Sequence, residues 1–326
     1  MPLETSIPSW LRSRWLRRSL QGILLLLLVI FVGRYLTGQW DRLQEQSVTV
    51  NWPVLIFSQL VLTLALALMA VPNWLVLRAL NARLPFATVL RFWFLSNIAK
   101  YLPGSIWSLP GRMFLYQRAG VPLAQGVVAV FWEALLLLLS ALLLTILGWP
   151  LFERQVPAAL LAGAIILMAL GMLAVLVIIS SLRLRKRVLT LPMPERLRRH
   201  LTREDLWLTL PQFLWLLALY VGCWLLIGVG FGMMVFAISP AFENGWWPQL
   251  IGLYMGAWLV GFVIIFTPGG IGPRDLLLGL GLSLLMNDPL PTVATILARI
   301  LWTLAEIVGV LLTSLFHGIR RTTPTD

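Results

Sequence analysis

Long runs of apolar residues, separated by short polar or basic connectors, are the dominant pattern in this sequence. A helix that crosses the hydrocarbon core of a bilayer needs about 20 predominantly apolar residues, and most of these runs reach or approach that length. We predict membrane-crossing helices over residues 20–32, 53–77, 122–147, 158–179, 206–235, 249–266 and 292–316. The predicted fold class is therefore all-α, a polytopic integral membrane protein.

Two stretches rich in proline and glycine interrupt this pattern. The first runs from Lys100 to Arg112 and the second from Thr267 to Asp275. Irregular backbone is tolerated at membrane depth only where protein buries it or a water-filled cavity lines it, because unpaired N–H and C=O groups are costly in hydrocarbon. We therefore expect the helices to surround these two breaks.

Basic residues set the predicted orientation. Arginines within residues 1–18 precede the first apolar run, which places a basic N-terminus in the cytoplasm. A basic flank before an apolar run also resembles a signal peptide, but no small-x-small cleavage pattern follows, so we expect the run to be retained as a span. The connector at 183–203 is dense in arginine and is the strongest cytoplasmic signal in the chain.

That connector reaches the cytoplasm only if Pro85–Arg118 enters and leaves the membrane from the same face. We therefore predict a re-entrant hairpin there, with a helix lying on the membrane surface as the alternative. If Pro268–Met286 crosses as a broken helix, the C-terminus is cytoplasmic too, as Arg320 and Arg321 favour. The architecture is then about eight transmembrane helices plus the hairpin, with seven as the alternative. All belong to a single transmembrane domain over 1–326, whose bundle covers 20–316.

Composition supports this interpretation and narrows the chemistry. The 326 residues are 59% hydrophobic and 12% charged, and the net charge is +12. Because the arginines cluster at the ends of apolar runs, the charge indicates contact with anionic headgroups and not with nucleic acid. One cysteine and two histidines form no pattern typical of a metal site or a nucleophile with its base, so we expect no metal, no cofactor and no catalytic residue.

Two acidic residues lie in the middle of predicted spans. Glu133 is central in 122–147 and Glu306 is central in 292–316, where Arg299 and Trp302 share its helix face. A charge in the membrane interior costs about 2.5–3.5 kcal/mol on insertion scales and often marks a functional site. The alternative is that each carboxyl group is neutral and only joins neighbouring helices through hydrogen bonds. Arg299 and Glu306 are about 10 Å apart along the helix axis, which suits a shared polar cavity better than a direct pair.

The two breaks resemble each other and each includes an arginine. The first reads Pro-Gly-Ser-Ile, then Pro-Gly-Arg ending at Arg112, and the second reads Pro-Gly-Gly-Ile-Gly-Pro-Arg ending at Arg274. Paired interrupted segments in the two halves of a chain are typical of a transporter site, and helix N-termini at such breaks attract anions. The alternative is that glycine and proline only allow a kink while the arginines extend to the interface.

At these residues the sequence resembles the membrane domain of lysylphosphatidylglycerol synthases and flippases, together with the stand-alone proteins built like it. The segments Lys100–Gly104 and Pro268–Asp275 are similar to that family's two Pro-Gly motifs, with Asp275 where the family usually has glutamate. Glu133 and Arg299 also fall where the family tends to carry such residues, although Ala134 follows Glu133 where an arginine is common. The likeness covers about Leu20 to Phe316.

The resemblance implies a protein of the plasma (inner) membrane that handles a lipid. In fused members this domain flips an aminoacylated phospholipid that a separate soluble domain makes. The sequence given ends at Asp326 without such a domain, so we do not expect it to synthesise the lipid. The substrate does not transfer with the family name.

Our hypothesis is a lipid flippase or translocase that moves a phospholipid or lipid-linked anionic headgroup. The predicted site comprises Lys100, Pro103, Gly104, Ser105, Arg112, Glu133, Pro268, Gly269, Gly270, Gly272, Arg274, Asp275, Arg299 and Glu306. Arg112 and Arg274 would hold the phosphate. Glu133 and Glu306 would pair with a cationic headgroup, with Arg299 or with a coupling proton.

Two other classes of function remain open. A transferase that uses a lipid carrier would need a carboxylate or histidine cluster near the interface, typically with Mg²⁺, and the loops contain none. A non-catalytic subunit of a lipid-modifying or glycosyltransferase system is the second alternative, because polar residues inside a membrane also join helices. The partners we expect are membrane lipids, with a lipid-synthesising or glycosyltransferase protein as a further candidate.

Overall fold

The structure, a computed structural model, describes residues 49–101, 107–148, 207–239, 246–264, 268–270, 272–287 and 289–319. The chain divides into residues 1–48 and Thr49–Asp326, and the description concerns the second unit. Several predictions lie outside the described residues: the basic N-terminus, the spans over 20–32 and 158–179, the connector at 183–203, and the site residues Pro103, Gly104 and Ser105. The single domain over 1–326 also stays a prediction.

Helices make up the described part, and no strand occurs in it. The elements in chain order are α2 Trp52–Leu68, α3 Ala70–Ala79, α4 Phe86–Ile98, η2 Ala99–Tyr101, α5 Ser108–Arg118, α6 Leu123–Gly148, α10 Leu210–Ile238, α11 Trp247–Val263, η7 Pro268–Gly270, α12 Pro273–Leu282 and α13 Leu290–Ile319. The predicted all-α class is confirmed.

Among these described helices, four stretches are long and apolar enough to cross a membrane: Trp52–Ala79, Leu123–Gly148, Leu210–Ile238 and Leu290–Leu315. Each overlaps most of a span predicted from the sequence. The first is divided at Met69 into α2 and α3. Pro72 explains the division, because its ring has no N–H to donate to the carbonyl of Leu68 and collides with it.

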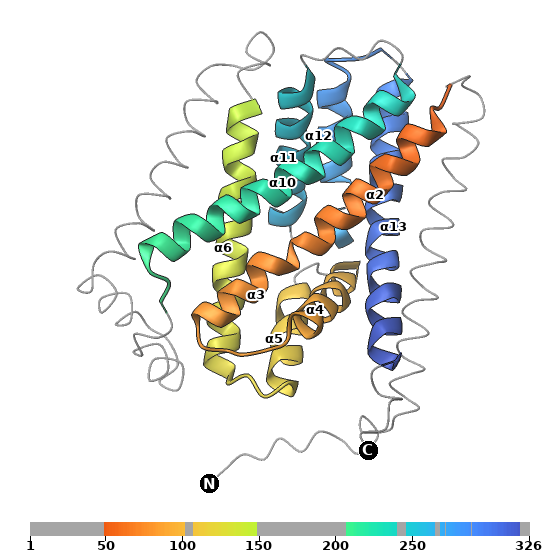
Figure 1. Cartoon of the computed structure of the whole chain (residues 1–326). Helices are drawn as coiled ribbons and strands as arrows, with labels where there is room; N and C mark the ends of the chain where they lie inside the picture. Colours follow the sequence, from red (N-terminus) through yellow and green to blue (C-terminus); the bar gives the residue numbers. More distant parts are fainter. Residues whose placement is uncertain are drawn as a thin grey trace. The chain divides into compact units, whose positions relative to one another are not determined.

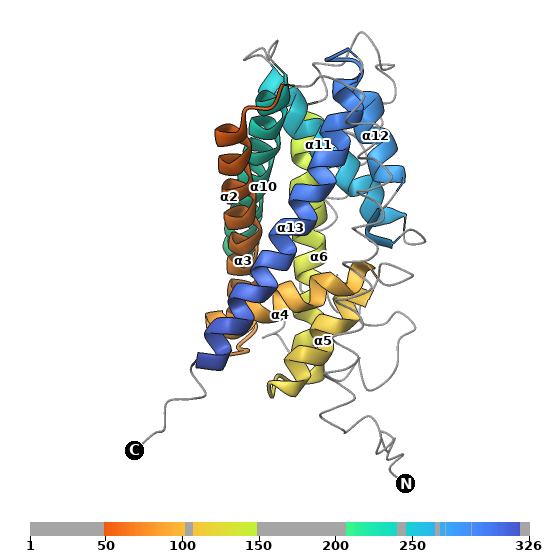
Figure 2. The same cartoon turned by 90° about the vertical axis from the view of Figure 1, so that its right-hand side faces the viewer.

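Helices far apart in the sequence pack side by side. Figures 1 and 2 show α2 running along α10, and the Ser58 hydroxyl donates a hydrogen bond of 2.7 Å to the carbonyl of Gly230 between them. Helix α11 packs against both α6 and α10, and α13 contacts α2 and α4. Of the described parts of the two breaks, η2 contacts α4 and α5, and η7 contacts α11 and α12. The surrounding of both breaks by the whole bundle stays a prediction.

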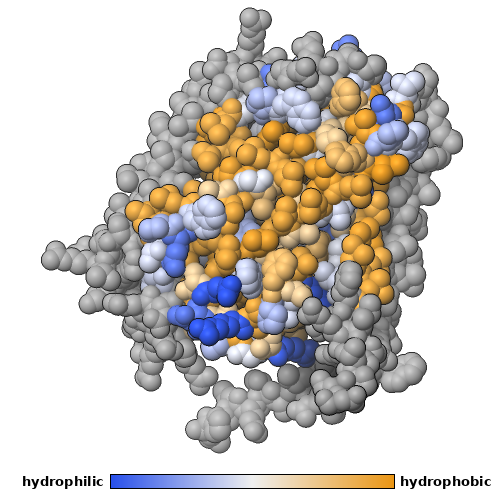
Figure 3. Space-filling model, in the orientation of Figure 1, coloured by the Kyte–Doolittle hydropathy of each residue, from blue (hydrophilic) through white to orange (hydrophobic). Residues whose placement is uncertain are grey.

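The outer surface of α2 and α10 is apolar. Large hydrophobic side chains are exposed along both helices, among them Ile56, Phe57, Leu60, Leu64, Leu214, Trp215 and Phe236. Figure 3 shows the resulting hydrophobic face, with hydrophilic residues gathered toward one end. Exposing such a surface to water is unfavourable, whereas contact with the hydrocarbon core of a bilayer is not.

The first interrupted region is a pair of short helices. Helices α4 and α5 have 13 and 11 residues, about 20 and 17 Å, so neither could cross a hydrocarbon core of about 30 Å alone. They pack against each other, and η2 at the end of α4 contacts η7 of the second break. The helical hairpin fits the predicted region, while its depth in a bilayer stays a prediction.

The second interrupted region leads from α11 through η7 into α12. Helix α12 begins at Pro273 and ends at Leu282, within the segment Pro268–Met286 that the sequence predicted as a broken helix. Its start has a local cause: Pro273 suits the first helical turn, and the Asp275 carboxylate accepts a hydrogen bond of 3.1 Å from the backbone N–H of Gly272.

Candidate functional site

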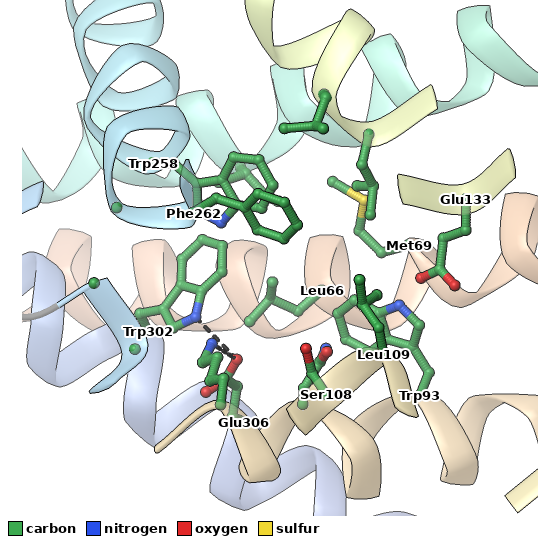
Figure 4. Close-up of a pocket in the computed structure, with 18 of the residues that line it drawn as sticks. Leu66, Met69, Trp93, Ser108, Leu109, Glu133, Trp258, Phe262, Trp302 and Glu306 are labelled. Atoms are coloured by element: carbon green, nitrogen blue, oxygen red, sulfur yellow. Dashed lines mark hydrogen bonds and ion pairs between the residues drawn. The ribbon is translucent and has the colours of Figure 1, made fainter. Parts of the chain in front are cut away.

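A cavity of about 400 Å³ lies where the two breaks meet the long helices. Apolar and aromatic side chains form part of its wall, including Leu66, Met69, Leu137, Trp224, Trp258 and Phe262. Five charged side chains also line it: Lys100, Arg112, Glu133, Arg274 and Glu306. Figure 4 shows Trp258 and Phe262 beside each other, while Glu133 and Glu306 lie at separate places on the wall. The cavity is therefore amphipathic.

Arg112 and Glu133 form a buried ion pair between α5 and α6, with side-chain exposures of 2% and 0%. The guanidinium also donates to Ser96 Oγ and Asn97 Oδ1, each at 2.9 Å. The second oxygen of Glu133 accepts a hydrogen bond from the Asn73 amide. This network joins α3, α4, α5 and α6. Because Arg112 and Glu133 already have several hydrogen-bond partners each, Arg112 has little capacity left for a ligand.

Glu306 pairs with Lys100 and not with Arg299, which was one of three partners that the sequence left open for it. The ion pair joins η2 to α13. Tyr101 donates its hydroxyl proton to Glu306 at 2.8 Å, and the indole N–H of Trp302 donates to the same carboxylate at 3.0 Å. Each buried carboxyl group therefore lies against a basic side chain of its own, in addition to its hydrogen-bond partners.

Arg299 binds the second break itself. One of its nitrogens donates to both carboxylate oxygens of Asp275 at 2.7 and 2.8 Å, and the other donates to the carbonyl of Gly269 at 2.9 Å. Such a fork fixes both the charge and the orientation of its partner. Arg299 and Asp275 therefore hold η7 and α12 against α13, and they lie behind the cavity wall and not on it.

The two breaks touch at glycines with left-handed backbone conformations. Gly269 has φ +57°, and a Cβ atom there would meet the ring of Tyr101 at 3.1 Å. Gly270 has φ +71°, and a Cβ atom there would meet the Cα of Gly261 on α11 at 2.9 Å. Only glycine allows this conformation and this close approach at no steric cost.

Arg274 is the cavity cation that differs from the others. It is 5% exposed, and it donates a hydrogen bond of 2.7 Å to the Tyr254 hydroxyl. Its guanidinium lies over the rings of Tyr254 and Trp302, at 5.0 and 4.8 Å from their centroids. Among the described residues, no carboxylate lies within ion-pair distance of it.

The structure thus brings Lys100, Arg112, Glu133, Gly269, Gly270, Arg274 and Glu306 together on one cavity, while Pro268 begins η7 and Gly272 precedes α12. Sequence reasoning missed Asn73, Tyr101 and Tyr254 as partners of the charged residues. Asn73 could have been found as a polar residue within an apolar run, and Tyr101 as a member of the first Pro-Gly motif, but Tyr254 gave no signal beyond membrane aromatics.

The apolar helices, the apolar outer surface and the enclosed charged cavity define an integral membrane protein. The family model for the lysylphosphatidylglycerol synthase TM region matches residues 19–312, and the chain belongs to that family. The expected resemblance is confirmed over nearly the same range. No curated protein matches the chain.

Proposed function

We propose that this protein is a lipid translocase: it receives the headgroup of a membrane lipid in the cavity and moves it across the bilayer. The lipid's phosphate binds Arg274, and its chains stay in hydrocarbon. The observation that carries the proposal is the buried Arg274 guanidinium, which faces a cavity and has no carboxylate partner among the described residues.

A buried cation without an anion is costly, so proteins rarely keep one unless a ligand supplies the missing charge. Arginine suits phosphate because its planar donors match the phosphate oxygens. The neighbouring rings of Tyr254 and Trp302 hold the guanidinium without neutralising it. The phosphate of a lipid headgroup has the required charge and geometry.

The apolar wall supports a lipid over a soluble anion. Trp224 lies 4.6 Å from Trp258, and Trp258 stacks on Phe262 at 5.1 Å between ring centroids. These rings border the same cavity as Arg274. A free phosphate ion would gain nothing from them, whereas a glycerol backbone or the start of a chain would be buried against them.

We place the protein in the plasma (inner) membrane, with the end that carries the exposed Arg78, Arg83 and Arg118 in the cytoplasm. These residues lie at the end of α3, in the loop after it and at the end of α5. The positive-inside preference supports that orientation, and both chain termini are then expected on the same side. A lipid-synthesising partner would supply the substrate there.

The test is headgroup accessibility in proteoliposomes that contain a trace of fluorescent phosphatidylglycerol. A membrane-impermeant reductant bleaches only the outer leaflet, so translocation appears as bleaching beyond that fraction. We expect wild type and Arg118→Gln to translocate the lipid and Arg274→Gln to be slower by at least about tenfold, the equivalent of about 1.4 kcal/mol.

Arg118 is a matched control because it is an exposed arginine that does not line the cavity. If no lipid moves, or if Arg274→Gln translocates like wild type, the translocase proposal is wrong. That result would favour the alternative function, a non-catalytic subunit of a lipid-modifying or glycosyltransferase system.

A further inference from the structure

The cavity has a definite charge balance, which bears on the headgroup it accepts. Among the described residues that line it, Lys100, Arg112 and Arg274 are positive, and Glu133 and Glu306 are negative. The two carboxylates each hold one cation, Glu133 with Arg112 and Glu306 with Lys100. One positive charge is therefore left over, and it resides on Arg274.

We infer that the lipid has a phosphodiester headgroup of a single negative charge with no further ionised group, an inference that rests on the proposed function. A monoanion neutralises Arg274 and leaves no charge unpaired in the cavity. Any other headgroup charge would bury an uncompensated ion, which is the costly outcome in a low-dielectric site.

A zwitterionic headgroup lacks a partner for its ammonium group. Glu133 is already bonded to Arg112 and Asn73, and Glu306 is bonded to Lys100, Tyr101 and Trp302. An ammonium group would have to displace a resident cation from one of these carboxylates. The displaced lysine or arginine would then be the unpaired ion.

A phosphomonoester, which is a dianion above its second pKa of about 6, lacks a second free cation. Lys100 is the nearest reserve, because its Nζ lies 5.3 Å from the centroid of the Trp302 ring and the Arg274 guanidinium lies 4.8 Å from the same centroid. The ion pair with Glu306 keeps Lys100 from binding a second negative charge of a ligand. Glu306 is therefore the specificity-determining residue that keeps the surplus charge at one.

The experiment measures binding and not translocation, so that it stands apart from the test of the proposed function. Purified full-length protein in neutral detergent at pH 8 is titrated with phosphatidylglycerol, phosphatidic acid and phosphatidylethanolamine of identical chains. Their headgroups are a phosphodiester monoanion, a phosphomonoester dianion and a zwitterion. Apparent Kd values are taken from the change in tryptophan fluorescence and checked by thermal unfolding.

For wild type we expect phosphatidylglycerol to bind at least about tenfold more tightly than the other two lipids. Glu306→Gln frees Lys100, so the preference should move toward phosphatidic acid by about tenfold or more. The double variant Lys100→Gln/Glu306→Gln restores a surplus of one charge and should return the preference to phosphatidylglycerol. A general defect in folding could not produce this exchange of preference and its reversal.

Equal binding of the three lipids to wild type, or binding of none, would overturn the inference. So would a Glu306→Gln variant that folds and keeps the wild-type preference. Translocation without any such preference would contradict the charge inference alone. The expected preference without translocation would leave the inference standing and contradict the proposed function.

Discussion

At the scale of single residues, the cavity contains cations in two different states. Arg112 and Lys100 each have a carboxylate partner, whereas Arg274 has aromatic rings and a hydroxyl group. The paired cations contribute to folding because the attraction and the hydrogen bonds offset their desolvation. The rings and the hydroxyl group offset less of the desolvation cost of Arg274, so a ligand explains this buried arginine better than a contribution to stability does.

This difference predicts that replacing each arginine by glutamine has a different effect on the free energy of unfolding. Arg274→Gln removes a buried unpaired charge, and we expect the free energy of unfolding to rise by about 1 kcal/mol or stay unchanged. Arg112→Gln leaves Glu133 unpaired and should lower it by about 3–5 kcal/mol. Thermal unfolding of both variants in the same detergent measures the contrast. Equal losses in the two variants would show that Arg274 is as well compensated as Arg112.

The Arg112–Glu133 pair also predicts a strong coupling. Arg112→Gln and Glu133→Gln each leave the other ion buried alone, whereas the double variant leaves none. We therefore expect the double variant to lose less stability than the sum of the single losses, by about 2–3 kcal/mol of interaction energy. A double-mutant cycle of unfolding free energies checks this, and strictly additive losses would contradict the ion pair.

At the scale of the elements, the second break is held by a few specific contacts. Arg299 binds the carbonyl of Gly269 and the carboxylate of Asp275, while Gly270 packs on the backbone of Gly261. The first break reaches it through Tyr101, whose ring covers Gly269. The cavity wall therefore depends on glycines that let one chain segment approach another.

Alanine substitutions at three glycines should give graded effects. Gly270→Ala combines a left-handed backbone with a collision against Gly261 backbone, so we expect the largest loss of stability, above about 3 kcal/mol. Gly272→Ala also has a positive φ but open space, so only the conformational cost of about 1–3 kcal/mol applies. Gly111→Ala lies within α5 with open space and should stabilise the protein slightly.

Thermal unfolding of the three variants tests this order. A Gly270→Ala variant as stable as Gly272→Ala would mean that η7 does not lie against α11 as described.

The helices could be predicted from the sequence because apolar runs of membrane length leave few alternatives. The two breaks were equally visible, since proline and glycine interrupt a helix wherever they gather. What could not be predicted was the pairing inside the cavity. Lys100 and Glu306 are 206 positions apart, and no local pattern says which cation meets which carboxylate. Helical spacing placed Arg299 on the same helix face as Glu306, but the partner of Glu306 is Lys100 from the first break.

The division between α2 and α3 was also missed by the prediction from sequence. The sequence predicted one continuous helix over 53–77, although Pro72 was available as a signal. Length and hydropathy outweighed a single proline in that prediction. In the structure, the division places Leu66 and Met69 on the cavity wall.

At the scale of the whole molecule, the described helices combine an apolar outer surface with a cavity lined by charged groups. Single cysteines test this in the background Cys223→Ser, which removes the lone native thiol. Ser108→Cys lies on the cavity wall and should react with a charged maleimide in vesicles. Ile56→Cys is 60% exposed on the outer surface and should react only after detergent extraction, because hydrocarbon covers it.

Labelling of Ile56→Cys in intact vesicles would contradict the assignment of α2 to the bilayer. A Ser108→Cys variant that stays unreactive in vesicles and reacts in detergent would mean that the cavity is closed to water.

The central claim is that a lipid headgroup occupies the cavity beside Arg274, and photocrosslinking tests it most directly. A phospholipid with a diazirine on its headgroup is incubated with the protein in liposomes and irradiated, and the labelled residues are identified by mass spectrometry. We predict labels on cavity residues such as Trp258, Phe262 and Trp302, and their loss in Arg274→Gln but not in Arg118→Gln. Labels confined to outward residues such as Phe57, Leu60 and Leu64, or unchanged in Arg274→Gln, would contradict the claim.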